Sequence, residues 1–343
     1  MPSVSFFSRS ALAALCVVSL ACPAKQERTA ELAKAAPSGK LIVYSGRSET
    51  LIGPVLKQFQ EKTGIVTEVR WGDTGELAAA ILEEGDKSPA KVFLAQDGGA
   101  LASLAAAGRL KELPTELREQ VEPRWVDPNG RWIGLSGRVR VLVVDPAKVP
   151  EAERPKSLRE LADKKWEGRI ALAPSNASLQ AHLAAWRAKN GGEDLQKLLA
   201  GIAANKPILL PKNPAVVEAV LTGEADIGLV NHYYLGQARK QRNAEVGLNH
   251  LPTADDGSAF VNIAGAGILA DDPAAIELVR FLLGPETQNH FATNTFEIPL
   301  VKNPPAHQAG LELAAGADAL HFAKVAAELP ATVQDLRASG LLP

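Results

Sequence analysis

Short apolar runs alternate with amphipathic segments along most of the chain. Residues 41–46 (LIVYSG) form a compact apolar run, and residues 50–64 carry apolar side chains at helical spacing before they end at Gly64. This pattern predicts a strand followed by a helix that stops at the glycine. The same reasoning predicts strands at 65–71 and 91–97 with a helix at 74–85 between them. Strands and helices in this order predict a mainly parallel sheet that is covered by helices.

A second series of the same kind begins after the apolar segment at 132–145. A strand is predicted at the start of 168–178, where the chain then enters a loop, and a helix is predicted at 178–191. Asn213 and Pro214 are predicted as the N-cap and first-turn residue of a further helix. The chain of 343 residues is 46% hydrophobic, which is enough for two domains with cores of their own.

Two tyrosines stand side by side directly after the last strand of this series. The segment 225–231 (ADIGLVN) predicts a buried strand, and Tyr233 and Tyr234 follow it in a chain that has three tyrosines in all. Ligands of open α/β sheets bind at the carboxyl ends of strands. A phenol titrates near pH 10, so at neutral pH a strongly positive partner such as a metal must displace its proton. Hard oxygen anions favour Fe(III), whereas the alternative is an aromatic pair that packs one ring in the core.

One glycine-rich segment matches a nucleotide-binding spacing. Gly265, Gly267 and Ala270 fit the pattern G-x-G-x-x-A. The dinucleotide fingerprint requires a helix that opens within the motif, but Asp272 and Pro273 predict the cap and first turn of a helix that begins later. We therefore interpret the segment as a strand that passes close to other backbone.

The N-terminal segment has the features of an export signal. Arg9 precedes an apolar run from Ala11 to Ala21, which is shorter than the roughly 20 residues of a membrane span. Residues 1–22 are therefore predicted to be a signal peptide with a lipobox-like end, in which Cys22 is lipidated. The alternative is ordinary cleavage beside an incidental cysteine. Residues 23–39 are predicted to form a polar tether.

Composition excludes several classes of protein. No cysteine follows Cys22, so thiolate metal sites are excluded. The formal net charge of −2, with lysine and arginine dispersed, is unlike the basic stripe of a nucleic-acid-binding protein. No later apolar run reaches membrane-spanning length. We therefore expect an exported protein that contacts the membrane through a lipid anchor alone.

Four stretches of the chain together resemble the bacterial ferric-ion-binding proteins, which are periplasmic or lipid-anchored receptors of ABC importers. The resemblance covers about residues 40 to 300, and it is carried in order by LIVYSGRSETLIGPVLKQFQEKTGI, EEGDKSPAKVFLAQDGGAL, LSGRVRVLVVD and GEADIGLVNHYYLGQARK. It implies an α/β fold of the bilobal type II periplasmic-binding-protein class. Such a clamshell has two mixed sheets that are flanked by helices and joined by two hinge strands.

The resemblance also implies a working arrangement. The N-terminal lobe is expected to comprise residues 40–137 and 262–300, and the C-terminal lobe residues 138–261 and 301–343. Fe(III) is expected as cargo in the interlobe cleft, with a carbonate-like synergistic anion. The implied partners are the permease and ATPase of an ABC importer, and the implied receptor is a periplasmic monomer rather than an enzyme.

Residue by residue, Tyr233 and Tyr234 match the paired tyrosine ligands of the family. Ser48 stands where some members have a histidine, and Gln96, followed by Asp97, stands where others have a glutamate. At a position where further members have a tyrosine or tryptophan, this chain has Leu172. The remaining cleft contacts are therefore expected from Ser48, Gln96 and Asp97, although for Asp97 the cap of a helix is the favoured role. Tyr44 is expected to be a packed core residue.

Arg47 places the chain with the members in which an arginine holds the anion. A guanidinium offers a planar fork of donors, and Asn176 lies near a predicted helix start with free backbone N–H groups. Arg138 is predicted either to bind the anion or to form a hinge or interlobe salt bridge.

Two rival functions remain, a receptor for another small anionic or organic solute and an enzyme on a bilobal scaffold. Against the enzyme, the sequence has no nucleophile elbow, zinc-protease helix or phosphate loop.

Overall fold

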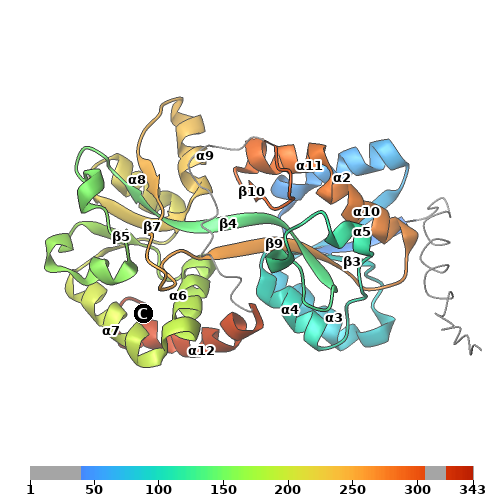
Figure 1. Ribbon diagram of the computed structural model, residues 1–343, viewed down its shortest axis with the longest axis horizontal. Helices are drawn as coiled ribbons and strands as arrows, with labels where there is room; N and C mark the ends of the chain where they lie inside the picture. Colours follow the sequence, from blue (N-terminus) through green and yellow to red (C-terminus); the bar gives the residue numbers. More distant parts are fainter. Residues whose placement is uncertain (1–39, 306–321, 343) are drawn as a thin grey trace, which may run out of the picture. The chain divides into compact units, whose positions relative to one another are not determined.

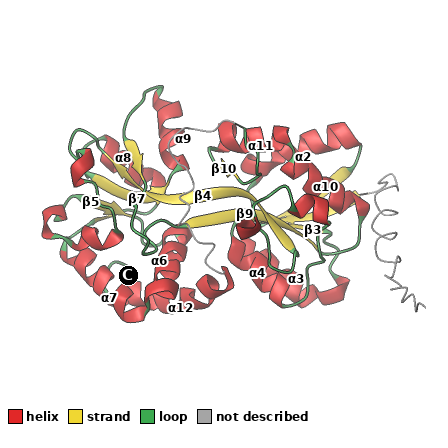
Figure 2. Cartoon of the chain, viewed as in Figure 1, coloured by secondary structure: helices red, strands yellow, loops and turns green. Residues whose placement is uncertain are grey.

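The computed structural model describes residues 40–305 and 322–342. Strands and helices alternate along these residues, as the sequence pattern predicts (Figures 1 and 2). The strands are β1 (Lys40–Ser45), β2 (Val66–Trp71), β3 (Val92–Ala95), β4 (Trp132–Val144), β5 (Ile170–Leu172), β6 (Ile208–Leu209), β7 (Ile227–Asn231), β8 (Leu248–His250), β9 (Val261–Ile268) and β10 (Ile298–Pro299). The main helices are α2 (Glu49–Thr63), α3 (Thr74–Glu84), α4 (Gly98–Ala106), α5 (Thr115–Arg118), α6 (Ala177–Asn190), α7 (Gly192–Ala204), α8 (Asn213–Leu221), α9 (Tyr233–Arg242), α10 (Pro273–Leu283), α11 (Pro285–His290) and α12 (Phe322–Ala338).

The strands are connected in the order β2-β1-β3-β9-β4-β7-β5-β6, and β8 and β10 also pair with β4. Strand β1 is parallel to β2 and β3, and β5 is parallel to β6 and β7. Every pairing made by β4 or β9 is antiparallel. The expectation of a mainly parallel sheet is therefore wrong for the middle of the structure, because β4 and β9 pair directly without the crossover helix that a parallel neighbour requires.

Strand β4 links two groups of strands. Its residues Trp132–Val139 pair with β9, and its residues Arg140–Val144 pair with β7. We call β1, β2, β3, β9 and β10 the first strand group, and β5, β6, β7 and β8 the second strand group. All thirteen residues of β4 are buried, so the link lies inside the protein. In Figure 1, β4 runs from one group to the other with helices on both sides.

The helix ends follow local signals in the sequence. Helix α2 stops at Gly64, whose φ of 74° is the left-handed conformation that glycine adopts readily. Asp272 caps α10 through the backbone N–H of Ala274 at 2.9 Å, so the predicted later helix is confirmed and the glycine-rich segment before it is strand β9. At α8 the N-cap is Lys212 rather than the predicted Asn213, which already has helical backbone.

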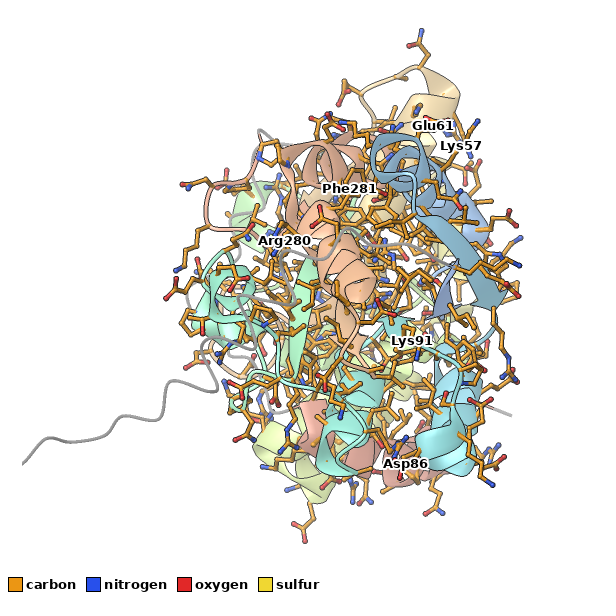
Figure 3. All side chains as sticks on the ribbon, turned by 90° about the vertical axis from the view of Figure 1, so that its right-hand side faces the viewer. Lys57, Glu61, Asp86, Lys91, Arg280 and Phe281 are labelled. Atoms are coloured by element: carbon orange, nitrogen blue, oxygen red, sulfur yellow. The ribbon has the colours of Figure 1, made fainter. Side chains whose placement is uncertain are left out.

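Apolar faces of the helices pack against both strand groups. Helix α10 meets α2 where the rings of Phe59 and Phe281 lie 5.4 Å apart, edge to face. Figure 3 labels Phe281 on the helix beside α2, and Lys57 and Glu61 of α2 form an exposed ion pair at 3.9 Å. Helix α12 packs against α6 and α7 and also against α4. Because α4 follows β3 and α6 follows β5, α12 contacts helices of both strand groups.

The predicted export features lie outside the described residues. They are the signal segment 1–22, the lipidated Cys22 and the tether 23–39. Across 40–305 and 322–342, no helix combines the length and the apolar character that crossing a membrane would require.

Candidate functional site

The two tyrosines open helix α9 at the carboxyl end of β7. Their ring centroids are 4.4 Å apart with an angle of 40° between the rings, and both side chains are half-buried. The phenol oxygen of Tyr233 accepts a hydrogen bond from the Nδ2 of Asn231 at 3.3 Å. The strand, the turn and the first helical residues therefore place both phenols together at the position predicted from the sequence.

Two arginines of β4 lie beside the phenols. Arg138 and Arg140 are two residues apart on one strand, so their side chains share a face. Only 6% of Arg138 and 1% of Arg140 is exposed. Arg140 donates to the carbonyl of Leu229 at 2.7 Å and to the Oδ1 of Asn231 at 3.4 Å. Arg138 donates to the carbonyl of Gln96.

The charges of these groups act on one another. Burial raises the pKa of Tyr233 to about 12, and the positive charge of Arg138 opposes that rise. Burial lowers the pKa of Arg140 to about 9, while Tyr233 and Tyr234 oppose that fall. A buried cation is costly unless it is compensated. In the described part of the chain Tyr233 and Tyr234 are the groups whose negative charge acts on Arg140, so an anion at either phenol would compensate this buried cation.

The first turn of α6 completes this side of the site. Asn176 is its N-cap, with Oδ1 accepting the backbone N–H of Ser178 at 3.0 Å and the Nδ2 of Asn213 at 3.1 Å. The Oγ of Ser178 accepts from the Nδ2 of Asn231 at 3.2 Å. Asn231 therefore connects the start of α6 to Tyr233. The N-terminus of a helix attracts anions through its N–H groups and dipole.

Sequence analysis did not single out three of these contributors. Asn231 and Ser178 form the link just described, and Arg140 lies beside the phenols on β4. For Arg140 the signal was present, because the spacing Arg138-x-Arg140 in a strand puts both side chains on one face. For Asn231 the available signal was its position, because it is a polar residue at the end of a buried strand just before the tyrosines.

Arg47 occupies a different environment from the one expected. It is fully buried, and its Nη2 forms an ion pair with Glu297 at 2.6 Å while its Nη1 donates to the Oγ of Ser136 at 3.2 Å. Its guanidinium also lies 5.0 Å from the ring centroid of Phe291. Burial would raise the pKa of Glu297, but Arg47 and Arg138 outweigh burial and lower it. These contacts favour a structural role for Arg47.

The other expected cleft contacts lie at the ends of β1 and β3. Ser48 is exposed at the N-cap of α2. Gln96 is half-buried, and its carbonyl receives the hydrogen bond from Arg138. Asp97 accepts the backbone N–H of Ala100 at 3.1 Å, which makes it the N-cap of α4 and confirms the capping role. Of the three, Gln96 alone makes direct contact with a residue of the tyrosine site.

The remaining tyrosine and the leucine on β5 are part of the interior. Tyr44 is 4% exposed and its hydroxyl contacts Glu84 at 3.0 Å, so the core assignment is confirmed. Leu172 is 3% exposed in the hydrophobic core. Within the described residues no group of three or more His, Cys, Asp and Glu side chains could hold a metal.

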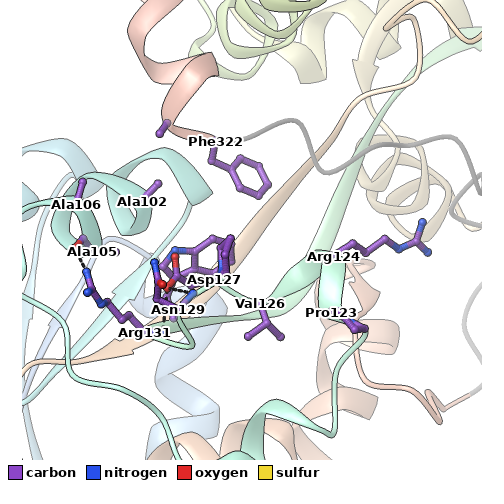
Figure 4. A pocket seen from close by; sticks show the side chains of 13 residues that line it. Ala102, Ala105, Ala106, Pro123, Arg124, Val126, Asp127, Asn129, Arg131 and Phe322 are labelled. Atoms are coloured by element: carbon purple, nitrogen blue, oxygen red, sulfur yellow. Dashed lines mark hydrogen bonds between the residues drawn. The ribbon is translucent and has the colours of Figure 1, made fainter.

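A cavity of about 390 Å³ lies elsewhere, beside α4, the start of β4 and the first residues of α12 (Figure 4). Trp132 and Phe322 contribute to its wall, with ring centroids 6.0 Å apart. Asp127 accepts the backbone N–H of Arg131 at 3.1 Å, and Arg131 donates to the carbonyl of Ala105 at 2.6 Å. None of the predicted site residues lines this cavity, so it is not part of the tyrosine site.

Comparison with known proteins gives consistent matches over most of the chain. Residues 87–316 match the family described as bacterial extracellular solute-binding protein. The Fe(3+)-binding periplasmic protein of Serratia marcescens is 32% identical over 260 residues, which cover 74% of this chain and 76% of that protein.

Two solved structures extend the match to the fold. Iron-bound HitA from Pseudomonas aeruginosa is 31% identical with a TM-score of 0.76, covering 88% of this chain and 100% of that chain. The Trichodesmium protein IdiA (FutA), solved in complex with iron and citrate ligands, is 26% identical with a TM-score of 0.74, covering 88% of this chain and 99% of that chain. The predicted fold class, a bilobal α/β arrangement of mixed sheets flanked by helices, is confirmed.

Proposed function

Since the chain belongs to the family of bacterial extracellular solute-binding proteins, we propose that it is a receptor that binds Fe(III) outside the cytoplasm and delivers it to an ABC importer. The family consists of solute-binding proteins, so the chain is not an enzyme, as the sequence predicted. Relatives are named for binding ferric iron, and an iron-bound structure has a similar fold. The assignment of Fe(III) as the cargo of this chain rests on the chain's own residues.

The observation that carries the proposal is the pair of phenols beside two buried arginines. Tyr233 and Tyr234 lie in contact at the end of a strand, and Arg138 and Arg140 supply positive charge next to them. Two phenolates are a hard, doubly charged ligand pair, which matches a small trivalent cation better than a soft metal. An aromatic pair that served packing alone would have no need of buried cations beside it.

A synergistic anion is the second part of the proposal. The charge of Fe(III) exceeds that of two phenolates, and the arginines add further positive charge, so an anion is needed at the metal. We propose that it binds between Arg138 and the start of α6 at Asn176, which Ser178 and Asn231 connect to Tyr233. Arg47, which the sequence suggested for this role, instead forms an ion pair with Glu297. Carbonate and citrate both fit, and citrate accompanies iron in the Trichodesmium structure.

The remaining expectations complete the receptor. Two lobes would close around the iron, an N-terminal lobe of residues 40–137 and 262–300 and a C-terminal lobe of residues 138–261 and 301–343. The tyrosine ligands would come from the C-terminal lobe, and the positive charge beside them from the arginines of β4. The receptor would act as a periplasmic monomer, be held to the membrane through a lipid on Cys22, and dock on the permease of an importer that its ATPase drives. Intact-mass analysis of protein from membranes tests the anchor, since an unlipidated N-terminus elsewhere would remove it.

The decisive experiment uses colour. Iron-free protein is titrated with Fe(III) nitrilotriacetate in bicarbonate buffer, and a visible phenolate-to-iron charge-transfer band is expected. Tyr233→Phe and Tyr234→Phe should each lose most of this band while the melting temperature without iron stays close to that of the wild type. Tyr44→Phe is the matched control, because Tyr44 lies in the core beside Glu84 and should leave the band unchanged.

The rival function, a receptor for another small anionic or organic solute, predicts a different result. In that case the wild type would show no band with iron, and citrate or a similar anion alone would raise the melting temperature. A band that persisted in both single variants would reject the two tyrosines as ligands.

A further inference from the structure

Phe296 has a backbone conformation that is unusual for its residue type. It follows a π-helical turn at Phe291–Thr295 and precedes β10, with φ of 58° and ψ of 22°. Left-handed backbone is rare for a bulky side chain and persists where the surroundings fix it. Here the neighbours do so, because the N–H of Glu297 donates to the carbonyl of Phe291 at 2.9 Å and the Glu297 carboxylate is held by Arg47. π-Helical turns are frequent at functional sites.

The ring of Phe296 lies against the helix that carries the tyrosines. A Cβ atom added at Gly236 of α9 would come within 2.9 Å of the ring Cδ1 and 3.0 Å of its Cγ, so glycine is required for this approach. The Nζ of Lys240 lies 6.0 Å from the ring centroid. Gly236 is three residues after Tyr233 and four before Lys240, so all three share one face of α9. Phe296 therefore packs one helical turn from a proposed iron ligand.

This contact joins the two strand groups. Phe296 is fixed to β10, which pairs with Ser136 and Gly137 of β4, whereas α9 follows β7, which pairs with Arg140–Val144. In Figure 1, α9 and β10 both lie above β4 toward its middle, α9 to the left and β10 to the right. A movement that separated the strand groups would have to pull the ring away from Gly236.

We propose that Phe296 is a positioning residue that braces the tyrosine helix across the two strand groups and thereby slows the release of iron. The inference rests on the proposed function, because it concerns the same phenols. Phe296 itself supplies no ligand atom. It holds α9 by packing, and the glycine opposite it lets the ring approach closely enough to do so. Glycine is a poor residue for a helix interior, which this close approach explains at Gly236.

A double-mutant cycle tests the brace directly. The proteins are wild type, Phe296→Ala, Gly236→Ala and the combined variant, and the measurement is the rate at which the coloured iron band decays in excess chelator. Loss of the partly buried ring in Phe296→Ala should accelerate release about tenfold, which corresponds to about 1.4 kcal/mol. Gly236→Ala should also accelerate release in the wild type, since the methyl group displaces the ring. In the Phe296→Ala background the same substitution should have little further effect.

Two controls separate positioning from general stability. Phe296→Gly removes the ring and also relieves the left-handed backbone, so it should melt no lower than Phe296→Ala without iron and still release iron rapidly. Gly53→Ala changes a helical glycine of α2 whose nearest neighbour within 4 Å is the flexible Glu49 side chain, and it should release iron at the wild-type rate.

The outcomes are distinct. Wild-type release rates in Phe296→Ala and Phe296→Gly, or effects of Gly236→Ala that simply add to those of Phe296→Ala, would overturn the brace while leaving iron binding intact. A wild type that never develops the band would instead overturn the proposed function.

Discussion

Arg47 and Arg138 are both buried arginines near the same strand, yet their partners give them different roles. Arg47 has a carboxylate within 2.6 Å, so its charge is compensated inside the fold. Arg138 donates to a backbone carbonyl and lowers the pKa of Tyr233 against the effect of burial, so part of its charge acts on the site. Within the described residues Arg138 forms no ion pair of its own, which is why we propose Arg138 rather than Arg47 as the partner of the anion.

Alanine at each position should separate these roles. Arg47→Ala leaves Glu297 as a buried unpaired charge and should lower the free energy of unfolding by about 3–5 kcal/mol. Arg138→Ala should weaken iron binding by about 10- to 150-fold in bicarbonate, the worth of one charged hydrogen bond, and by less in bicarbonate-free buffer. Urea unfolding without iron and iron titration in both buffers measure the two effects. The assignment is reversed if Arg47→Ala keeps its stability and removes the response to bicarbonate.

The phenols make iron binding depend on pH in a defined direction. Burial raises the pKa of Tyr233 to about 12, so its proton is present at neutral pH and must leave when iron binds. Each phenol that binds as phenolate should raise the affinity about tenfold per pH unit between about pH 6 and pH 8, and binding should weaken as the pH falls. Competition against a chelator, corrected for the chelator's own protonation, measures the slope. A flat profile would mean that no phenol proton is displaced.

At the scale of elements, helix caps account for residues that look like ligands in the sequence. Asp97 follows β3 at the edge where ligands bind, but its carboxylate is bonded to the first turn of α4. Asn176 has the same position before α6. Capping and ligand binding require the same oxygen atoms at the same end of a helix, so the sequence could not distinguish them.

Two substitutions of Asp97 resolve this ambiguity. Asp97→Ala removes the cap and should lower the free energy of unfolding by about 1 kcal/mol, with iron affinity unchanged. Asp97→Asn keeps a good capping side chain without the negative charge, so it should retain both stability and iron affinity. Chemical denaturation and iron titration of the two variants provide the comparison, and a loss of iron affinity in Asp97→Asn would identify the carboxylate as a ligand.

The local sequence pattern predicted the strands and helices. It could not predict contacts between residues that are far apart along the chain. The strand at 41–46, the helix that stops at Gly64 and the tyrosine pair after a buried strand all depend on neighbouring residues. The partner of Arg47 lies 250 positions away, and the antiparallel insertion of β9 depends on a segment that follows the whole second strand group. A periodic pattern specifies which face of an element is buried but does not specify what lies against it.

At the scale of the described chain, several features connect the two strand groups. Strand β4 belongs to both, helix α12 packs on α4 as well as on α6, and Phe296 packs on α9. The proposed iron site lies beside the first and third of these, where Arg138 and Arg140 of β4 face the phenols. A ligand held there should therefore stabilise the connection between the groups as well as its immediate surroundings.

Iron should accordingly raise the stability of the entire chain. A ligand that binds only the folded state at 100 times its dissociation constant adds about 2.7 kcal/mol, which for a protein of this size corresponds to a rise in melting temperature of roughly 4 °C. Calorimetry with and without saturating Fe(III) and bicarbonate measures the shift, and one transition that moves as a unit is expected because the proposed iron site lies where the groups join. The variant with both Tyr233→Phe and Tyr234→Phe should melt like the iron-free wild type under either condition. If iron raised the melting temperature of this double variant as much as that of the wild type, the metal would be bound away from the tyrosines. If only one of two separate transitions moved in the wild type, the metal would be bound within one strand group alone.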